Sequence, residues 1–249
     1  MKKYKLAEET LEIYGCTLHR IVALRDFGDV RKGNIGGWIE DEDNLSRDDD
    51  CWVCGDAIVY GNAKVYGNAI VYGNAIVYGN AIVCGDAEVC GNAIVYGNAI
   101  VCGNAIVCGD AEVCGNAKVY GDAEVYGDAR VYGEAEVYGD ARVYGEARVC
   151  GKARVYGEAR VYGEARVCGK ARVCNNAVIK NMSDYIVFKN WWSSGRYFTW
   201  TRSNDMWTVG CFYGTGEELI KKAYNDSEEK GREYERIVKY VESIKQEFK

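Results

Sequence analysis

The sequence predicts a mainly β protein built as a parallel β-helix, and two features of a long internal repeat lead to that prediction. A branched aliphatic residue recurs at every sixth position from Val53 to Val173, with Ile179 in the same phase, and no residue is inserted or deleted in that run. The repeating unit is Val-(Tyr/Cys)-Gly-(Asn/Asp/Glu)-Ala-x. A period of six does not match the roughly 3.6 residues of an α-helical turn, so the repeat indicates short strands joined by corners.

Each hexad predicts one strand and one corner. In the order Ala-x-Val-Tyr, small and branched side chains alternate with variable and aromatic ones, as they do when a strand buries one face. The Gly-Asn and Gly-Asp pairs that follow tolerate the backbone angles of a tight turn. Three such hexads close one triangular coil. Coils stacked about 4.8 Å apart then give a rod of about seven coils.

The repeat occupies residues 51–180 and leaves two flanking regions, which we expect to cap its ends because an open strand edge recruits other chains. Residues 1–50 form the expected N-terminal cap, and residues 181–249 form an expected α+β module. In this module the predicted strands span 185–188, 197–202 and 206–213, with a hairpin turn at 203–205. The predicted helices span 216–225, after a capping box that begins at Thr215, and 232–248.

The composition limits the class of protein. No apolar run approaches the roughly 20 residues that span a bilayer. The N-terminal lysines are followed by glutamates rather than by the apolar core of a secretory signal. We therefore expect a cytoplasmic protein with no membrane segment. In that reducing compartment the twelve cysteines are expected to be thiols.

Nine of these cysteines replace tyrosine in the same position of the hexad. Pairs that lie three hexads apart would be stacked at a distance that disulfides use, so oxidation or capture of a soft metal is an alternative. Exchange of Tyr for Cys within an expanding repeat is the simpler explanation. The stacked pairs are Cys84 with Cys102, Cys90 with Cys108, and Cys150 with Cys168.

The hexads resemble those of the hexapeptide-repeat superfamily of left-handed parallel β-helices, in which an aliphatic residue stands four positions before a small one. Within it the chain most resembles the YdcK-type group of bacterial and prophage proteins, usually labelled transferases, and the likeness extends to residues 21–27, 36–40 and 44–46. The resemblance implies a left-handed coil. It says little about chemistry, because the superfamily includes acyltransferases, nucleotidyltransferase tails, carbonic anhydrases and scaffolds.

Acyltransferases of the superfamily generally use a coil histidine as general base, and its carbonic anhydrases bind zinc through three histidines. This chain has one histidine, His19, which lies in the leader, and no loop interrupts the hexads. The sequence therefore predicts no metal site and no cofactor, and His19 is the only candidate for a catalytic base.

One face of the predicted rod is apolar over three successive coils. Monomers rarely leave such a patch exposed, so we expect it to form an oligomer interface, although stacked side chains could simply stabilise the sheet. The superfamily resemblance suggests a trimer. The residues of this face are Ile58, Tyr60, Ile76, Tyr78, Ile94 and Tyr96.

Charge is distributed unevenly along the chain. Residues 1–141 carry a net charge of −12, whereas residues 142–202 carry +8, and the corner acids Asp128, Glu146 and Glu164 are expected to relieve repulsion between stacked arginines. An aromatic and basic segment follows the rod. It could bind single-stranded nucleic acid, bind a protein or form the core of the cap. The expected partner-binding residues are Arg148, Arg154, Arg160, Arg166, Arg172, Trp191, Trp192, Arg196, Trp200 and Arg202.

The sequence thus favours a non-catalytic β-solenoid scaffold or binding protein that acts through contacts with a protein or another macromolecule. One alternative is a divergent acyltransferase-like enzyme with a site between subunits. Another is a phage-encoded inhibitor that presents a rigid charged surface to a host protein.

Overall fold

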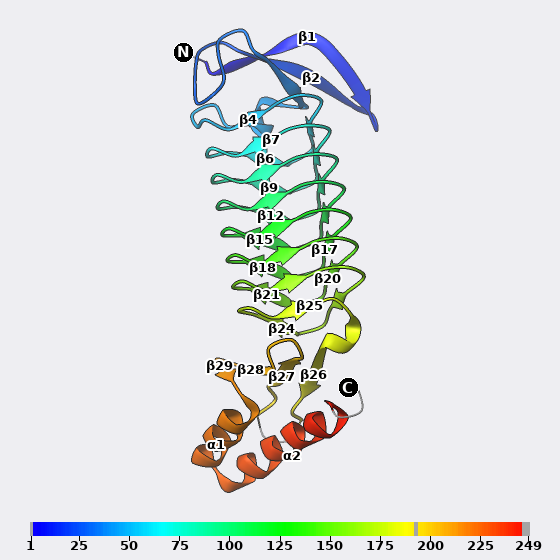
Figure 1. The fold of residues 1–249 in the computed structure, drawn as a ribbon. Coiled ribbons are helices and arrows are strands. Elements are labelled where there is room, and N and C mark those ends of the chain that lie inside the picture. Colours follow the sequence, from blue (N-terminus) through cyan, green and yellow to red (C-terminus); the bar gives the residue numbers. More distant parts are fainter. Residues whose placement is uncertain (1, 192–193, 246–249) are drawn as a thin grey trace.

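A computed structural model describes residues 2–191 and 194–245 of the chain. The molecule is a narrow rod of stacked coils with a long hairpin at its N-terminal end and a small module of strands and helices at the other end (Figure 1). The prediction of a mainly β, parallel solenoid is confirmed. Neither helix, as far as the structure describes it, is long and apolar enough to cross a membrane.

Three parallel sheets form the sides of the rod, and the stacked strands of each sheet come from successive coils. The first face consists of β3 (Ile35–Ile39), β5 (Ile58–Val59), β8 (Ile76–Val77), β11 (Ile94–Val95), β14 (Glu112–Val113), β17 (Arg130–Val131), β20 (Arg148–Val149) and β23 (Arg166–Val167). The second face consists of β4 (Trp52–Val53), β7 (Ile70–Val71), β10 (Glu88–Val89), β13 (Ile106–Val107), β16 (Glu124–Val125), β19 (Arg142–Val143), β22 (Arg160–Val161) and β25 (Val178–Ile179). The third face consists of β6 (Lys64–Val65), β9 (Ile82–Val83), β12 (Ile100–Val101), β15 (Lys118–Tyr120), β18 (Glu136–Tyr138), β21 (Arg154–Tyr156) and β24 (Arg172–Val173).

The interior of the rod is filled by the Val and Ala positions of the hexads. All of them are buried from Val53 to Ala177, and most have no exposed surface. The corner glycines have positive φ angles, and they pack backbone to backbone on the corners of the next coil. At Gly85, for example, an added Cβ would lie 2.9 Å from the backbone nitrogen of Gly103. A regular hexad is therefore required both for the core and for the stacking of the corners.

The parallel ladder begins earlier than the hexads indicate. Trp38 in β3 pairs with Ile58, whereas Trp52 in β4 pairs with Ile70, so the first pairing spans a longer stretch of chain than the three hexads of every later coil. The first coil thus contains two more residues than the later coils, and these two residues lie between 39 and 52. They shift the first coil out of the six-residue phase. The count of about seven coils rises accordingly to eight strands on two faces and seven on the third.

An antiparallel hairpin extends the first face beyond β3. It consists of β1 (Tyr4–Ile13) and β2 (Cys16–Ala23), and β2 pairs with β3. A short 3-10 helix (Glu42–Asn44) completes this end of the rod.

The C-terminal module contains an antiparallel sheet of β26 (Tyr185–Lys189), β27 (Tyr197–Thr201), β28 (Met206–Val209) and β29 (Phe212–Gly214), preceded by a 3-10 helix (Met182–Asp184). Helices α1 (Gly216–Asp226) and α2 (Glu228–Lys245) follow. The Thr215 capping box is confirmed, since the Thr215 hydroxyl accepts from the backbone nitrogen of Glu218 and the Glu218 carboxylate accepts from that of Thr215. The single strand predicted at 206–213 is wrong, because a turn at Gly210 divides it in two.

The two ends of the rod expose the backbone groups of unpaired strand edges. Along each strand, alternate residues bond to the next coil and to the preceding coil; the Ile70 N–H, for example, donates to the Ala87 carbonyl oxygen of the next coil. The first and last coils therefore each leave both N–H and carbonyl groups without a neighbouring coil. The Asn44 amide donates to two carbonyl groups at the first end, and the Thr199 hydroxyl accepts from the Arg172 N–H at the last. The caps satisfy edges that another chain could otherwise pair with.

Candidate functional site

The change from acidic to basic residues along the rod is marked by ion pairs between adjacent coils. Outward residues that occupy the same position in successive coils form columns along the rod. In four of these columns, the first or an early cation pairs with a carboxylate of the preceding coil, three hexads earlier in the chain. These pairs are Arg130 with Glu112 at 3.4 Å, Arg142 with Glu124 at 3.3 Å, Lys152 with Glu134 at 2.9 Å, and Arg154 with Glu136 at 2.9 Å.

Later cations in these columns have no carboxylate within ion-pair distance in the described parts of the chain. The predicted corner acids do not supply one: Asp128, Glu146 and Glu164 form no ion pair there, and the neutralising carboxylates lie mostly on the faces instead. The cations without such a partner are Arg148, Arg160, Arg166, Lys170 and Arg172.

The third face differs from the other two at its corners. On the first face, the arginines at 148 and 166 each follow a corner glutamate two residues earlier, and on the second face Arg160 follows Glu158. On the third face the corner positions are Lys152 and Lys170. Positive charge is therefore concentrated on this side of the last coils.

These residues line a pocket, which we call the basic pocket, where the third face meets the C-terminal sheet. Its cavity volume is about 330 Å³. The Arg172 guanidinium donates from Nη1 to the carbonyl oxygen of Gly210, which fixes its position. The Lys170 ammonium lies 4.8 Å from the centre of the Tyr197 ring, a cation–π contact. The lining residues are Lys152, Arg154, Lys170, Arg172, Arg196, Tyr197 and Gly210.

The basic pocket brings together only part of the predicted partner-binding set. Arg154, Arg172 and Arg196 line it. Arg148 and Arg166 lie in a separate hollow of about 350 Å³ on the first face, beside the two corner glutamates, and Arg160 lies on the second face. Sequence reasoning did not single out Lys152, Lys170 or Tyr197. The available signal was the lysine at two corners of the rod where the others have Asn, Asp or Glu.

The aromatic residues of the predicted partner-binding segment divide between interior and surface. Trp200 is 3% exposed and its indole nitrogen donates to Asp205 at 2.7 Å, so its prediction as a partner-binding residue is wrong. Strand alternation turns it into the core formed by the sheet and the helices. Trp191 is 72% exposed, with the Lys189 ammonium 4.0 Å from its ring centre. Trp192 lies outside the described residues.

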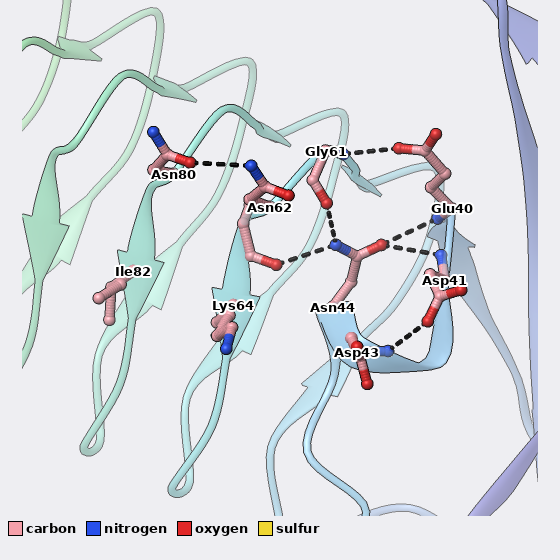
Figure 2. A pocket seen from close by; sticks show the side chains of 10 residues that line it. Glu40, Asp41, Asp43, Asn44, Gly61, Asn62, Lys64, Asn80 and Ile82 are labelled. Carbon is pink, nitrogen blue, oxygen red and sulfur yellow. Dashed lines mark hydrogen bonds between the residues drawn. The ribbon is translucent and has the colours of Figure 1, made fainter.

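A larger hollow, of about 770 Å³, lies at the first end of the rod, and its polar groups are mostly paired with one another (Figure 2). The Asn44 side chain is at its centre. The amide donates to the carbonyl groups of Gly61 and Ala63, both at 2.9 Å, and its oxygen accepts from the backbone of Glu40 and Asp41. These contacts complete the edge of the first coil, so we assign Asn44 a structural role.

His19, the candidate base, lies on β2 and is partly buried. Its Nδ1 atom is buried and has no hydrogen-bond partner among the described residues. A general base is normally oriented by such a partner, and none is in place here. In the described part of the chain, no three His, Cys, Asp or Glu side chains are grouped closely enough to hold a metal ion.

The apolar residues of the first face lie where the hexads predict. Their strands are adjacent, and the rings of Tyr60, Tyr78 and Tyr96 form a stacked ladder with centres 5.1 and 5.0 Å apart. Burial, followed by the neighbouring Tyr78 and by Tyr14, raises the pKa of Tyr60. Tyr14 is in the turn of the β1–β2 hairpin, so this turn lies near the start of the ladder.

The expectation that all cysteines are thiols is wrong for one stacked pair. Cys150 and Cys168 form a disulfide, with Cα atoms 4.6 Å apart on successive coils. Cys84, Cys90, Cys102 and Cys108 remain thiols. Burial, followed by the neighbouring Cys90, raises the pKa of the Cys108 thiol to about 11.

The stacked coils and their buried Val and Ala columns define a β-solenoid protein. The repeats match the family described as YdcK Beta solenoid repeat, at residues 63–79, 71–85, 87–103, 135–151 and 153–169. The repeats of the rod are thus similar to those of YdcK-type β-solenoids, as the sequence resemblance predicts.

One curated relative is named "Uncharacterized acetyltransferase YdcK" and comes from Escherichia coli strain K12. It is 36% identical to this chain over 61 residues, which are 21% of this chain and 19% of the relative. The match thus spans about one fifth of the length of the curated relative.

Proposed function

We propose that this chain is a non-catalytic β-solenoid binding protein whose basic last coils, with the C-terminal module, bind an acidic macromolecular partner. The observation that carries the proposal is the group of cations at 148, 160, 166, 170 and 172, which lack carboxylate partners among the described residues. Stacked like charges repel, and an acidic partner would relieve that repulsion.

A partner of this kind would be recognised by electrostatic complementarity on a rigid surface. Arg148 and Arg160 project from two-residue strands whose backbones are held by ladder hydrogen bonds on both sides, as at Arg148, which donates to Ala165. Rigid positioning lowers the entropy that the protein loses on binding. A protein partner is favoured over single-stranded nucleic acid, because stacking on successive bases needs several exposed rings, and Phe198 and Trp200 of this segment are buried.

Binding to poly-L-glutamate, a model acidic chain, tests this proposal. The test variant carries Arg148→Ala, Arg160→Ala and Arg166→Ala. The control carries Lys5→Ala, Lys64→Ala and Lys118→Ala, which removes the same charge from exposed residues in the other half of the chain. We expect binding that weakens with salt, and a loss of at least tenfold in the arginine variant alone. Equal losses in both variants would count against a site at this end.

The name of the E. coli relative favours a second candidate, an acetyltransferase. Titration of the chain with acetyl-CoA in a calorimeter separates the two candidates. Saturable binding of acetyl-CoA that persists in an excess of inorganic phosphate would support the enzyme and contradict the non-catalytic proposal. The non-catalytic proposal is supported if acetyl-CoA produces no binding heat while poly-L-glutamate still binds.

We also propose that the Ile and Tyr face of the first coils joins copies of this chain, with a trimer as the first expectation. The six side chains of this face are half-buried within one chain, and they form a continuous apolar surface over three coils. Sedimentation of the chain and of an Ile76→Lys variant tests this proposal. We expect the variant to be monomeric, and identical masses for the two proteins would refute the interface.

A further inference from the structure

We propose that the basic pocket is a binding site for a phosphate group. This inference deepens the proposed function, because it names the chemical group that the same end of the rod receives. It depends on the pocket alone, however, and its test needs no macromolecular partner.

The first step of the argument is the charge of the pocket. Five of the seven lining residues are cations. Glu134 and Glu136 neutralise Lys152 and Arg154, which lie on the earlier of the two coils. Lys170, Arg172 and Arg196 have no carboxylate within ion-pair distance in the described parts of the chain. A single carboxylate would leave most of this charge uncompensated, whereas a phosphate monoester carries about −1.5 to −2 at pH 7.

The second step is the placement of the donors. Lys170 lies at a corner, two residues before Arg172 at the start of β24, and Arg196 lies directly before β27 of the C-terminal sheet, on the other side of the pocket. The Arg196 side chain lies over Gly210, where an added Cβ would be 3.5 Å from its Cδ atom. Cations therefore approach the cavity from two separate parts of the fold. Convergent arginine donors match the geometry of a phosphate.

The third step is the preorganisation of these groups. The Arg172 backbone is held by the Thr199 hydroxyl and its guanidinium by the Gly210 carbonyl, while no other guanidinium N–H of Arg172 donates to a described residue. The Tyr197 ring supports the Lys170 ammonium. Two of the donors are thus positioned before any ligand arrives, which lowers the entropy lost on binding.

The fourth step concerns size. A cavity of about 330 Å³ lies at the small end of the range for ligand pockets. It suits one phosphate group with a small substituent. The two carboxylates at 134 and 136 border the pocket on the side of the earlier coils. A nucleic acid strand extending in that direction would meet negative charge, so the basic track is too short to favour a polymer of phosphates.

Inorganic phosphate is the first probe. Its binding is measured by calorimetry and by the rise in melting temperature, with sodium chloride added to the blank to match the ionic strength. The test variant is Lys170→Ala with Arg196→Ala. The control is Lys64→Ala with Lys118→Ala, two cations of the same face on the first and the middle strand of that face. We expect at least tenfold weaker phosphate binding in the test variant and unchanged binding in the control.

A second pair of probes, a phosphoserine peptide and the same peptide without the phosphate, shows which kind of molecule supplies the phosphate group. Tighter binding of the phosphopeptide than of inorganic phosphate assigns the pocket to a phosphorylated side chain of a partner. Equal or weaker binding assigns it to a free phosphate or a small phosphate ester. The proposal is overturned if phosphate has no effect beyond that of chloride, if both variants lose binding equally, or if an oligonucleotide binds while phosphate does not.

These results are independent of the poly-L-glutamate experiment. Failure of phosphate binding with intact poly-L-glutamate binding would overturn the phosphate site and leave the proposed function standing. Phosphate binding without poly-L-glutamate binding would support the phosphate site and overturn the proposed function.

Discussion

The backbone N–H of Arg172 donates to the hydroxyl oxygen of Thr199 at 3.0 Å, and this bond attaches the last strand of the third face to the C-terminal sheet. The same kind of contact recurs around the last coil. The backbone N–H of Val178 donates to the Ser203 hydroxyl, and that of Lys180 donates to the Asp184 carboxylate. Side-chain acceptors thus replace the carbonyl groups that a further coil would provide.

The Thr199 hydroxyl is therefore expected to contribute to stability through the rod rather than through its own sheet. Replacing Thr199 with Val keeps the shape and removes the acceptor, so the Arg172 N–H loses its partner. Thr199 is 1% exposed, and an unsatisfied buried group costs about 1–3 kcal/mol. Urea unfolding measures the change. Thr17→Val, at an exposed threonine, is the control and should change the free energy of unfolding by less than about 0.5 kcal/mol.

At the opposite end of the rod, the Asn44 amide donates two hydrogen bonds to backbone carbonyl groups. Asn44→Asp retains the acceptor oxygen but places a carboxylate against the carbonyl groups of Gly61 and Ala63. We expect the free energy of unfolding to fall by about 3 kcal/mol. Asn116→Asp is the matched control, because the Asn116 oxygen only accepts from Asn98 and an aspartate can do the same. Equal effects of the two substitutions would contradict the capping role.

Two corner glycines allow the backbone strain of a positive φ angle to be measured separately from the steric clash of an added Cβ. Gly85 and Gly169 both have φ +73°, but an added Cβ at Gly85 would lie 2.9 Å from the Gly103 nitrogen, whereas Gly169 has nothing within 4 Å. Both alanine variants carry the backbone strain of a positive φ. We expect Gly85→Ala to cost about 1–3 kcal/mol more, because it also forces the coils apart. Urea unfolding of the two variants measures the difference, and equal values would refute close corner packing.

The fold of residues 51–180 could be predicted from the hexads because side-chain size repeats in phase with the backbone geometry. The first coil could not, since two extra positions between 39 and 52 remove that phase while the strand pairing continues. The hairpin of β1 and β2 was missed for a related reason. β1 is exposed or only half-buried at most positions, so its sequence lacks the strict alternation that marks a half-buried strand.

The basic end of the rod could be predicted from charge counts, but the pocket could not. Its formation depends on Arg196 and Tyr197 reaching the third face from another sheet, a long-range arrangement that no local pattern encodes. Trp200 shows the same limit. Aromatic and basic residues alternate along that segment, yet only the fold determines that Trp200 turns inward while Arg196 stays at the surface.

Stability is expected to fall in alkaline solution. Burial and Cys90 raise the pKa of Cys108 to about 11, and a hydrogen bond with Cys84, followed by burial, raises the pKa of Tyr66 to about 12. A raised pKa in the folded state favours the protonated form. Its contribution is complete below the unfolded pKa, about 9 for cysteine and 10 for tyrosine, and is lost as the pH rises towards the folded value.

The melting temperature, followed by circular dichroism from pH 8 to 11 at constant ionic strength, should therefore decrease most steeply above about pH 9. Cys108→Ser removes one of these groups and should make the decrease shallower between pH 9 and 11. A melting temperature that is constant over this range, or the same slope in the variant, would show that these groups titrate alike in the folded and unfolded states.

The Cys150–Cys168 disulfide joins two successive coils near the end of the rod. We expect it to stabilise the fold, because the cross-link lowers the conformational entropy of the unfolded chain. The two residues are 18 positions apart, and closing a loop of about that size contributes about 3 kcal/mol. Mass spectrometry under non-reducing conditions should show one loss of two hydrogens, not three. Reduction with dithiothreitol should lower the melting temperature of the natural chain and leave that of Cys150→Ser unchanged. Cys84→Ser is the matched control, because Cys84 is a thiol stacked on Cys102, and its melting temperature should still respond to the reductant. A natural chain with no mass loss and no response to dithiothreitol would show that this pair stays reduced like the others.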